Sequence, residues 1–291
     1  MPIDIIVVTC DSSQWIPDFW RSLLVSLKKA NGCVHGRLIV ADSGSTDQTL
    51  QVVRDMGGDG GEVVVRECGH IGFGAAANQG LKLCQSEWVL ICNPDLTFTE
   101  NFFIELQNVI ARHPDKGRIS CLAPRLYHPN GSVQASVGAF PSVWGIVKDQ
   151  FRARTMRKYL SIQPDALQEI DWATGACLAF KRRVLEQVGG FDEHYFLYVE
   201  EVDLQKRLRA AGFEIVFAPQ LGVIHHQPNA ARPKQDHIQK YAARGNLRYF
   251  AKYSSWVTLW MYRLMALVSG RLSVREVFLS RSEILQQRTG P

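Results

Sequence analysis

The stretch Arg37-Leu-Ile-Val-Ala-Asp-Ser-Gly-Ser-Thr-Asp47 decides how the first part of this chain folds. Its apolar first half, through Ala41, predicts a strand. The turn formers and carboxylates that follow are good N-cap residues, and they predict a helix from about Gln48 to Met56. The stretch therefore predicts one unit of strand, polar loop and helix.

The same alternation continues on both sides of this unit. Further strands are predicted at Ile3–Thr9, Glu62–Arg66 and Trp88–Cys92, and further helices at Trp15–Ala30 and Ala75–Cys84. Strands that alternate with helices favour a mainly parallel sheet flanked by helices, an α/β fold.

Acidic loops follow two of these strands. Asp42 and Asp47 come after the second strand, and Asp95 comes after the fourth. The carboxyl ends of parallel strands meet at one edge of the sheet, where ligands bind in open α/β folds. Carboxylates there suit a hard cation, Mg²⁺ or Mn²⁺, that holds phosphates. The structural alternative is that each Asp only caps a turn.

A third acidic group is Glu200-Glu201-Val202-Asp203, which follows an aromatic and apolar run. An acid partly shielded from water there has a raised pKa and can act as a general base. The alternative is that these acids stabilise the N-terminus of a helix predicted at Leu204–Ala211. His225 is a candidate to add an imidazole to the same metal.

The segment Gly72-Phe-Gly74-Ala-Ala-Ala77 matches a dinucleotide-binding pattern, with Asp95 at a suitable distance. That pattern needs its glycine turn directly after a strand. Cys68–Ile71 separates the two here, which disfavours an NAD-dependent oxidoreductase.

The charge is divided unevenly along the 291 residues, whose net charge is +5. Residues 1–226 hold 22 Lys and Arg against 25 Asp and Glu, whereas residues 227–291 hold 11 against 3. The second region contains basic residues near helical spacing and then the apolar run Trp256–Val268, which is too short to span a bilayer. We expect a helical tail that contacts an anionic membrane surface rather than nucleic acid. The alternatives are a tail that packs on the catalytic domain or that forms a homodimer.

Seven cysteines without a C-x-x-C pair are expected to be reduced thiols. The start of the chain reads as a strand and not as a signal peptide, so a cytoplasmic protein is expected.

Together, these motifs resemble the inverting nucleotide-sugar glycosyltransferases of family 2, and within them the bacterial rhamnosyltransferase-like group. The resemblance covers about residues 3–226, in the family's order. It is carried by Val7–Asp11, Ala41–Asp47, His70–Gly80, Ile91–Asp95, Trp172–Ala176, Gly189–Arg207 and Pro219–His225.

The resemblance implies a GT-A fold, the nucleotide-diphospho-sugar transferase fold, at 1–226. Its nucleotide-binding half would span about 1–120 and its acceptor half about 121–226, with the helical tail at 227–291. The donor nucleotide would lie against Thr9, Asp11, Asp42, Asn78 and Asn93.

The resemblance also assigns the remaining roles. Asp95 would bind Mg²⁺ or Mn²⁺, with His225 as a further ligand, and Glu201 would be the general base. The acceptor side would be formed by Trp172, Gly175, Asp192 and Glu200.

The implied activity is transfer of a sugar, rhamnose from dTDP-rhamnose, to a glycan or lipid-linked acceptor in bacterial surface polysaccharide synthesis. This places the protein at the cytoplasmic face of the inner membrane. Family members have Asp where Glu201 stands and Asn where Asp11 stands. These two differences motivate an alternative, a non-catalytic nucleotide-sugar-binding scaffold of a glycan assembly complex.

Overall fold

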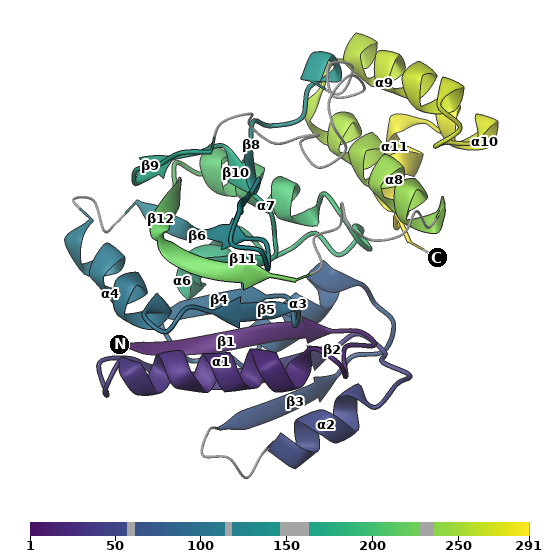
Figure 1. Ribbon diagram of the computed structural model, residues 1–291. Helices are drawn as coiled ribbons and strands as arrows, with labels where there is room; N and C mark the ends of the chain where they lie inside the picture. Colours follow the sequence, from purple (N-terminus) through teal and green to yellow (C-terminus); the bar gives the residue numbers. More distant parts are fainter. Residues whose placement is uncertain (57–61, 114–117, 146–162, 227–235, 291) are drawn as a thin grey trace.

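A computed structural model describes residues 1–56, 62–113, 118–145, 163–226 and 236–290 (Figure 1). One twisted sheet runs through the molecule, helices cover both of its faces, and the tail helices gather at one end.

The first half of the sheet is parallel, in the order β3-β2-β1-β4. Each strand lies within two residues of its prediction, which confirms the strand and helix alternation. The elements are β1 Pro2–Thr9, α1 Ile16–Lys29, β2 His35–Asp42, α2 Thr49–Asp55, β3 Val63–Glu67, α3 Phe73–Leu81 and β4 Trp88–Cys92.

The second half of the sheet is mixed, in the order β4-β11-β6-β12-β5. Only three residues separate β4 from β5, and a parallel continuation would need a crossover of a dozen or more. The chain therefore reverses direction there. The elements of this half are β5 Leu96–Phe98, α4 Phe102–Arg112, β6 Ile119–Tyr127, β7 Val133–Gln134, β9 Gln168–Glu169, β11 Cys177–Lys181, α6 Arg182–Gln187, α7 Glu200–Ala210 and β12 Glu214–His225. Beside it, β8 Val137–Gly138 and β10 Trp172–Ala173 pair antiparallel as a separate small sheet.

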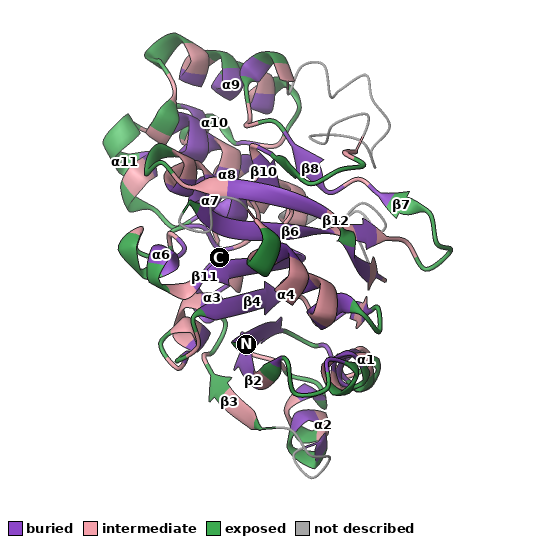
Figure 2. Cartoon of the chain, turned by 90° about the vertical axis from the view of Figure 1, so that its left-hand side faces the viewer, coloured by how far each residue is buried: buried purple, intermediate pink, exposed green. Residues whose placement is uncertain are grey.

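The sheet has a hydrophobic core on each face. Ile3, Ile5 and Val7 of β1 belong to a cluster with residues of α1 and α4, whereas Ile6 and Val8 belong to a second cluster with residues of α3, α6 and α7. Side chains alternate between the two faces of a strand, so a nearly continuous apolar run fills both cores. Figure 2 shows the central strands β4, β6 and β11 of this sheet as buried.

The described part of the tail, 236–290, contains four helices: α8 Asp236–Tyr253, α9 Trp256–Val268, α10 Val274–Val277 and α11 Arg281–Gln286. A third core joins α8 to the region before the tail, because Leu247 and Phe250 belong to one cluster with Trp172, Tyr195 and Val202. Among the described residues, no helix is both long and apolar enough to cross a membrane.

Candidate active site

The loops after β1 and β2 are tied together through Asp42. Its buried carboxylate accepts a hydrogen bond from the Thr9 hydroxyl (2.8 Å) and from the backbone N–H groups of Gly44 (3.1 Å) and Ser45 (2.9 Å). Asp42 and Thr9 thus lie side by side at the sheet edge, as register between β1 and β2 requires. The carboxylate also closes its own turn, so the predicted turn-capping role is present.

Asp11 links the same two loops from the solvent side. Its backbone adopts a left-handed conformation (φ 47°), and its carboxylate accepts from the N–H groups of Thr46 (2.7 Å) and Asp47 (3.2 Å). Asp47 in turn accepts from the N–H groups of Ser13 and Thr49. Slight burial would raise the pKa of Asp47, but these hydrogen bonds outweigh it and hold the pKa at about 2.

Asp95 and His225 form the most unusual pair at this edge. Pairing of β5 with β12 places the two residues together, with His225 Nε2 3.5 Å from Asp95 Oδ1. Both are at least 95% buried, yet both Asp95 carboxylate oxygens and His225 Nε2 form no hydrogen bond with any residue that the structure describes. Gln134 contacts the other ring nitrogen of His225 at 3.2 Å and orients the ring.

These unpartnered atoms fit a divalent cation. A buried carboxylate without a donor is costly, and a cation would satisfy it. Within the described ranges, no group of three His, Cys, Asp or Glu side chains is placed to hold a metal ion. Asp95 and His225 would supply two ligands, and phosphate oxygens and water would complete the set, as is usual for Mg²⁺.

Glu201 is another buried acid with an oxygen that has no hydrogen-bond partner among the described residues. The helix α7 begins at Glu200, four residues before the predicted start, so Glu200 and Glu201 both lie in its first turn. Glu201 is 5% exposed and its Oε2 has no hydrogen-bond partner. Gly175 lies against it, since a Cβ at position 175 would be 3.3 Å from Glu201 Cβ. Glycine at 175 therefore leaves room for the acid.

Asn93 connects the two acidic regions through the backbone. Its N–H donates to the carbonyl of Ala176 at 2.9 Å, which joins the end of β4 to the turn that contains Gly175. The side chain of Asn93 is partly exposed.

The turn before Glu200 is strained. Tyr198 (φ 71°) and Val199 (φ 75°) both adopt the left-handed conformation, which costs on the order of 1–3 kcal/mol for each non-glycine residue. Gly245 of α8 packs directly on this turn, because a Cβ there would lie 2.8 Å from the Tyr198 carbonyl oxygen. A tail helix thus supports the turn that presents the acids.

Gln205 is a site residue that the sequence did not indicate. Its buried amide donates to the carbonyls of Ala173 (2.7 Å) and Glu201 (2.9 Å) and accepts from the N–H of Ala173 (2.8 Å). It clamps β10 to the first turn of α7. The only sequence signal was its position four residues after Glu201, on the same helix face.

Two residues that were expected to contact the acceptor, Trp172 and Asp192, instead form hydrogen bonds with other parts of the protein. Trp172 is 1% exposed and donates from Nε1 to the Ala139 carbonyl at 2.7 Å. The Asp192 carboxylate accepts from Arg248 (2.8 Å) and Lys252 (3.1 Å) of α8. Burial would raise the pKa of Asp192, but these partners and His194 hold it well below its usual range.

The expectation that the basic residues of the tail face a membrane is therefore wrong for two of them. Arg248 and Lys252 point inward, where Lys252 also contacts the fully buried Asp203. Arg244 pairs with Glu276 of α10. This is the alternative in which the tail helix packs on the catalytic part of the chain.

Asn78 and the glycine motif hold α3 against the segment that leads to α7. The Asn78 amide exchanges two hydrogen bonds of 2.9 Å with the backbone of Phe191. A Cβ at Gly72 would lie 2.1 Å from the Phe196 carbonyl oxygen, and one at Gly74 would lie 2.9 Å from Phe191 Cβ. Close packing explains the glycines without a dinucleotide.

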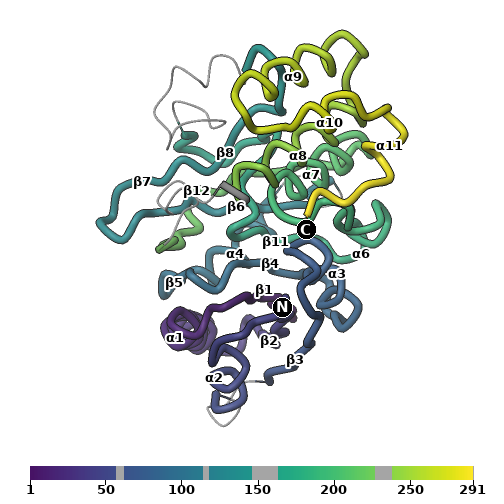
Figure 3. Tube along the Cα trace, turned by 90° about the vertical axis from the view of Figure 1, so that its right-hand side faces the viewer, coloured from purple at the N-terminus to yellow at the C-terminus, as the bar shows by residue number. Residues whose placement is uncertain are grey.

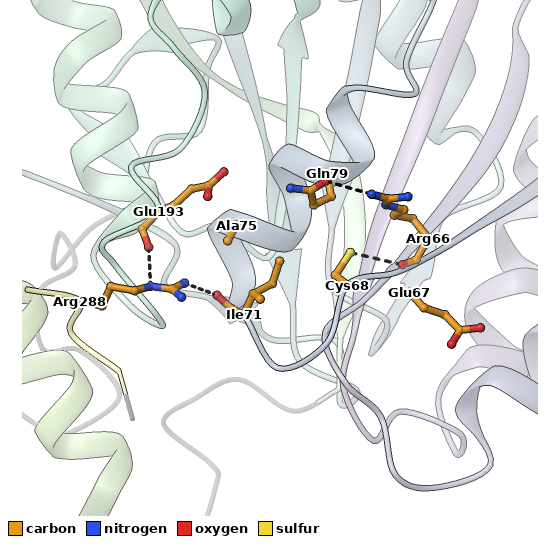
Figure 4. A pocket seen from close by; sticks show the side chains of 8 residues that line it. All are labelled: Arg66, Glu67, Cys68, Ile71, Ala75, Gln79, Glu193 and Arg288. Atoms are coloured by element: carbon orange, nitrogen blue, oxygen red, sulfur yellow. Dashed lines mark hydrogen bonds between the residues drawn. The ribbon is translucent and has the colours of Figure 1, made fainter.

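A cavity of about 310 Å³ lies beside α3, away from these acids (Figure 4). Arg288 reaches it from the tail and donates to the carbonyls of Glu193 (3.1 Å) and Ile71 (2.8 Å). Neither Asp95 nor Glu201 lines it, so it is separate from the candidate site.

Solved structures with the same fold include nucleotide-sugar complexes. GalNAc-T7 with UDP, GalNAc and Mn²⁺ superposes with a TM-score of 0.68 at 14% identity, covering 94% of this chain and 53% of that chain. A mannosyltransferase from Pyrobaculum calidifontis with GDP-Man and Mn²⁺ gives a TM-score of 0.57 at 16% identity, covering 97% and 71%. These likenesses confirm the GT-A fold.

Sequence relatives identify the family. A protein from Mycobacterium tuberculosis described as N-acetylglucosaminyl-diphospho-decaprenol L-rhamnosyltransferase is 27% identical over 307 residues, which cover 98% of this chain and 95% of the relative. The model of the family described as "Glycosyl transferase family 2" matches residues 4–189. That match takes in well over half of the chain, and the protein therefore belongs to glycosyl transferase family 2.

Proposed function

We propose that this protein is an inverting, metal-dependent glycosyltransferase that moves rhamnose from dTDP-rhamnose to a glycan or lipid-linked acceptor. The observation that carries the proposal is a set of buried polar atoms that form no hydrogen bond with the described residues: both oxygens of Asp95, His225 Nε2 and Glu201 Oε2. Burial of a carboxylate without a hydrogen-bond partner lowers the stability of the folded protein. Such a group is therefore expected to gain its partners when metal ion and substrate bind.

The roles follow from the chemistry of each group. A divalent ion held by Asp95 and His225 would neutralise charge on the departing nucleoside diphosphate. Glu201 would accept the proton of the acceptor hydroxyl, and its shielded position keeps water from competing. Thr9, Asp11 and Asp42 would form the wall of the nucleotide site. Direct attack by the hydroxyl on the sugar inverts the anomeric carbon and needs no nucleophile from the protein.

The relative from M. tuberculosis supports rhamnose as the sugar and a lipid-linked acceptor.

The test is a titration of the full chain with Mn²⁺ and a panel of nucleoside diphosphates and their sugars, followed by transfer assays. We expect dTDP-rhamnose to bind most tightly and only with metal present. Absence of binding by every donor would contradict the proposal, and tight binding without transfer to any acceptor would indicate a scaffold.

We also propose that α9 and α10 contact the cytoplasmic face of the membrane, where a lipid-linked acceptor is found. The outer side of α9 exposes Val257 (59%), Leu264 (62%) and Val268 (81%), and α10 is followed by exposed Phe278 (68%). Apolar residues beside basic ones are typical of helices that lie on anionic membranes.

Flotation with anionic vesicles tests this contact. Leu264→Glu with Val268→Glu should abolish binding, whereas Val25→Glu, an exposed valine of α1, should not. If the double variant instead converts a homodimer to a monomer and vesicles never bind, the face is a dimer interface.

A further inference from the structure

A second cavity, of about 620 Å³, lies within the tail between α8, α10 and α11. Five cationic side chains line it, and Glu276 is its one acid among the described residues. The five are Lys240, Arg244, Arg271, Arg275 and Arg288.

Most of this positive charge is not neutralised by the protein. Arg244 pairs with Glu276, and the Arg288 guanidinium donates to the carbonyls of Glu193 and Ile71 beside the first cavity, so three cations remain: Lys240, Arg271 and Arg275. Among described residues, no carboxylate forms an ion pair with Lys240, Arg271 or Arg275. Guanidinium groups gathered in a concave site match phosphate oxygens in geometry as well as charge.

The cavity opens beside an apolar surface. Arg275 lies on α10 between exposed Val274 and exposed Phe278, and the ring of Phe278 contacts the ring of Trp260 of α9 edge to face. Leu272 and Leu279 belong to the cavity lining itself. A ligand with a phosphate head and an apolar chain would satisfy both surfaces at once.

Two residues that line the cavity contact Phe196, which precedes the turn that presents Glu201. They are Thr289 and Gly290, and the Thr289 hydroxyl accepts from the Phe196 N–H at 2.9 Å. The end of the described chain runs back from α11 toward the catalytic part (Figure 3). Arg244 precedes Gly245, which packs on Tyr198.

We infer that this cavity binds the diphosphate of a lipid-linked acceptor, with the lipid chain on the apolar surface of α9 and α10. The inference rests on the proposed function and assigns the acceptor class: a lipid diphosphate rather than a free glycan. Arg271 and Arg275 bind the phosphate oxygens, and Phe278 contacts the chain.

The test measures binding by calorimetry to the full chain in EDTA, so that a metal-dependent donor site cannot take up diphosphate. The probes are farnesyl diphosphate, inorganic diphosphate and farnesol. Farnesyl diphosphate should bind at least tenfold more tightly than either other probe. Arg271→Ala with Arg275→Ala should weaken it by about tenfold or more, because each lost charged hydrogen bond costs about that factor.

The matched control is Arg183→Ala with Arg281→Ala, which removes two exposed arginines outside the cavity and should leave binding unchanged. Equal binding by the cavity variant and wild type, or no binding of farnesyl diphosphate, would overturn the inference. Inorganic diphosphate binding as tightly as farnesyl diphosphate would also overturn it, by pointing to a free phosphate site.

Transfer kinetics separate this inference from the proposed function. With N-acetylglucosamine linked to farnesyl diphosphate as acceptor, the cavity variant should raise the acceptor KM about tenfold and leave the donor KM unchanged. Failure of dTDP-rhamnose to bind would contradict the proposed function alone. Normal donor binding with an unaltered acceptor KM in the cavity variant would contradict the inference alone.

Discussion

The buried and half-buried acids of this protein have two opposite kinds of surroundings. Among the described residues, both carboxylate oxygens of Asp95 and Oε2 of Glu201 have no hydrogen-bond partner. Asp203, equally buried, accepts from Tyr253 (2.9 Å), Arg207 (2.8 Å) and Lys252, and Asp192 accepts from two cations of α8. Burial alone therefore does not mark a functional acid in this protein; burial without a partner does.

The largest effect should come from Glu201→Gln. The change keeps the size of the side chain but removes the base, so kcat should fall by about 10²–10⁴-fold. The melting temperature should stay equal or rise, because an uncompensated buried charge is removed. Near-wild-type transfer by this variant would show that Glu201 is not the general base. It would also contradict the idea that a buried acid without a hydrogen-bond partner is a functional one.

Asp95→Asn should separate metal binding from folding. We expect loss of Mn²⁺-dependent donor binding in a titration, with little loss of thermal stability, since the native carboxylate accepts no hydrogen bond from the described residues and has only His225 Nε2 at 3.5 Å to lose. The matched variant is Asp203→Asn, whose carboxylate has cationic partners. Its free energy of unfolding in urea should fall by about 3–5 kcal/mol, because Lys252 and Arg207 remain partly buried without a counter-ion. Similar stability losses in both variants would contradict the distinction.

Gly175→Ala tests the space beside Glu201. A methyl group there would lie 3.3 Å from Glu201 Cβ, so the acid must shift by a few tenths of an ångström. Because rate is sensitive to such displacement, kcat should fall by roughly tenfold while donor KM is unchanged. Ala176→Gly, at the next position, serves as the control for backbone effects. An unaltered kcat in Gly175→Ala would show that Glu201 tolerates the shift.

The smallest effect concerns pH. Burial would raise the pKa of Asp4, but the N–H groups of Ser86 and Gln85 and the Arg37 guanidinium outweigh it and lower the pKa, as the α8 cations do for Asp192. Both acids bind protons more weakly in the folded chain than in the unfolded chain. The stability they contribute is therefore complete above the unfolded pKa of about 3.9 and is lost as pH falls below it. Urea denaturation at pH 7, 5, 4 and 3 should show this decline, reduced in Asp192→Asn. An unchanged pH dependence in that variant would argue against the Asp192 contribution.

Much of the fold followed from local signals. The strands of the first half ended within two residues of their predicted positions because apolar runs and polar strand ends are local properties. The mixed second half and the early start of α7 did not follow, since both depend on contacts between segments far apart in the chain. The left-handed turn at Tyr198 and Val199, which sets the start of α7, is held by Gly245 from the tail.

The sequence by itself determined which chemistry was available: acids and a histidine at strand ends, in the order typical of family 2. The tertiary structure alone decided how each was used. Asp95, His225 and Glu201 kept atoms without partners, whereas Asp192 and Asp203 were neutralised by Arg248 and Lys252, cations that the sequence had suggested for a membrane surface. The physical reason is that the properties of a charge depend on the atoms that surround it, and those atoms come from segments that only folding brings together.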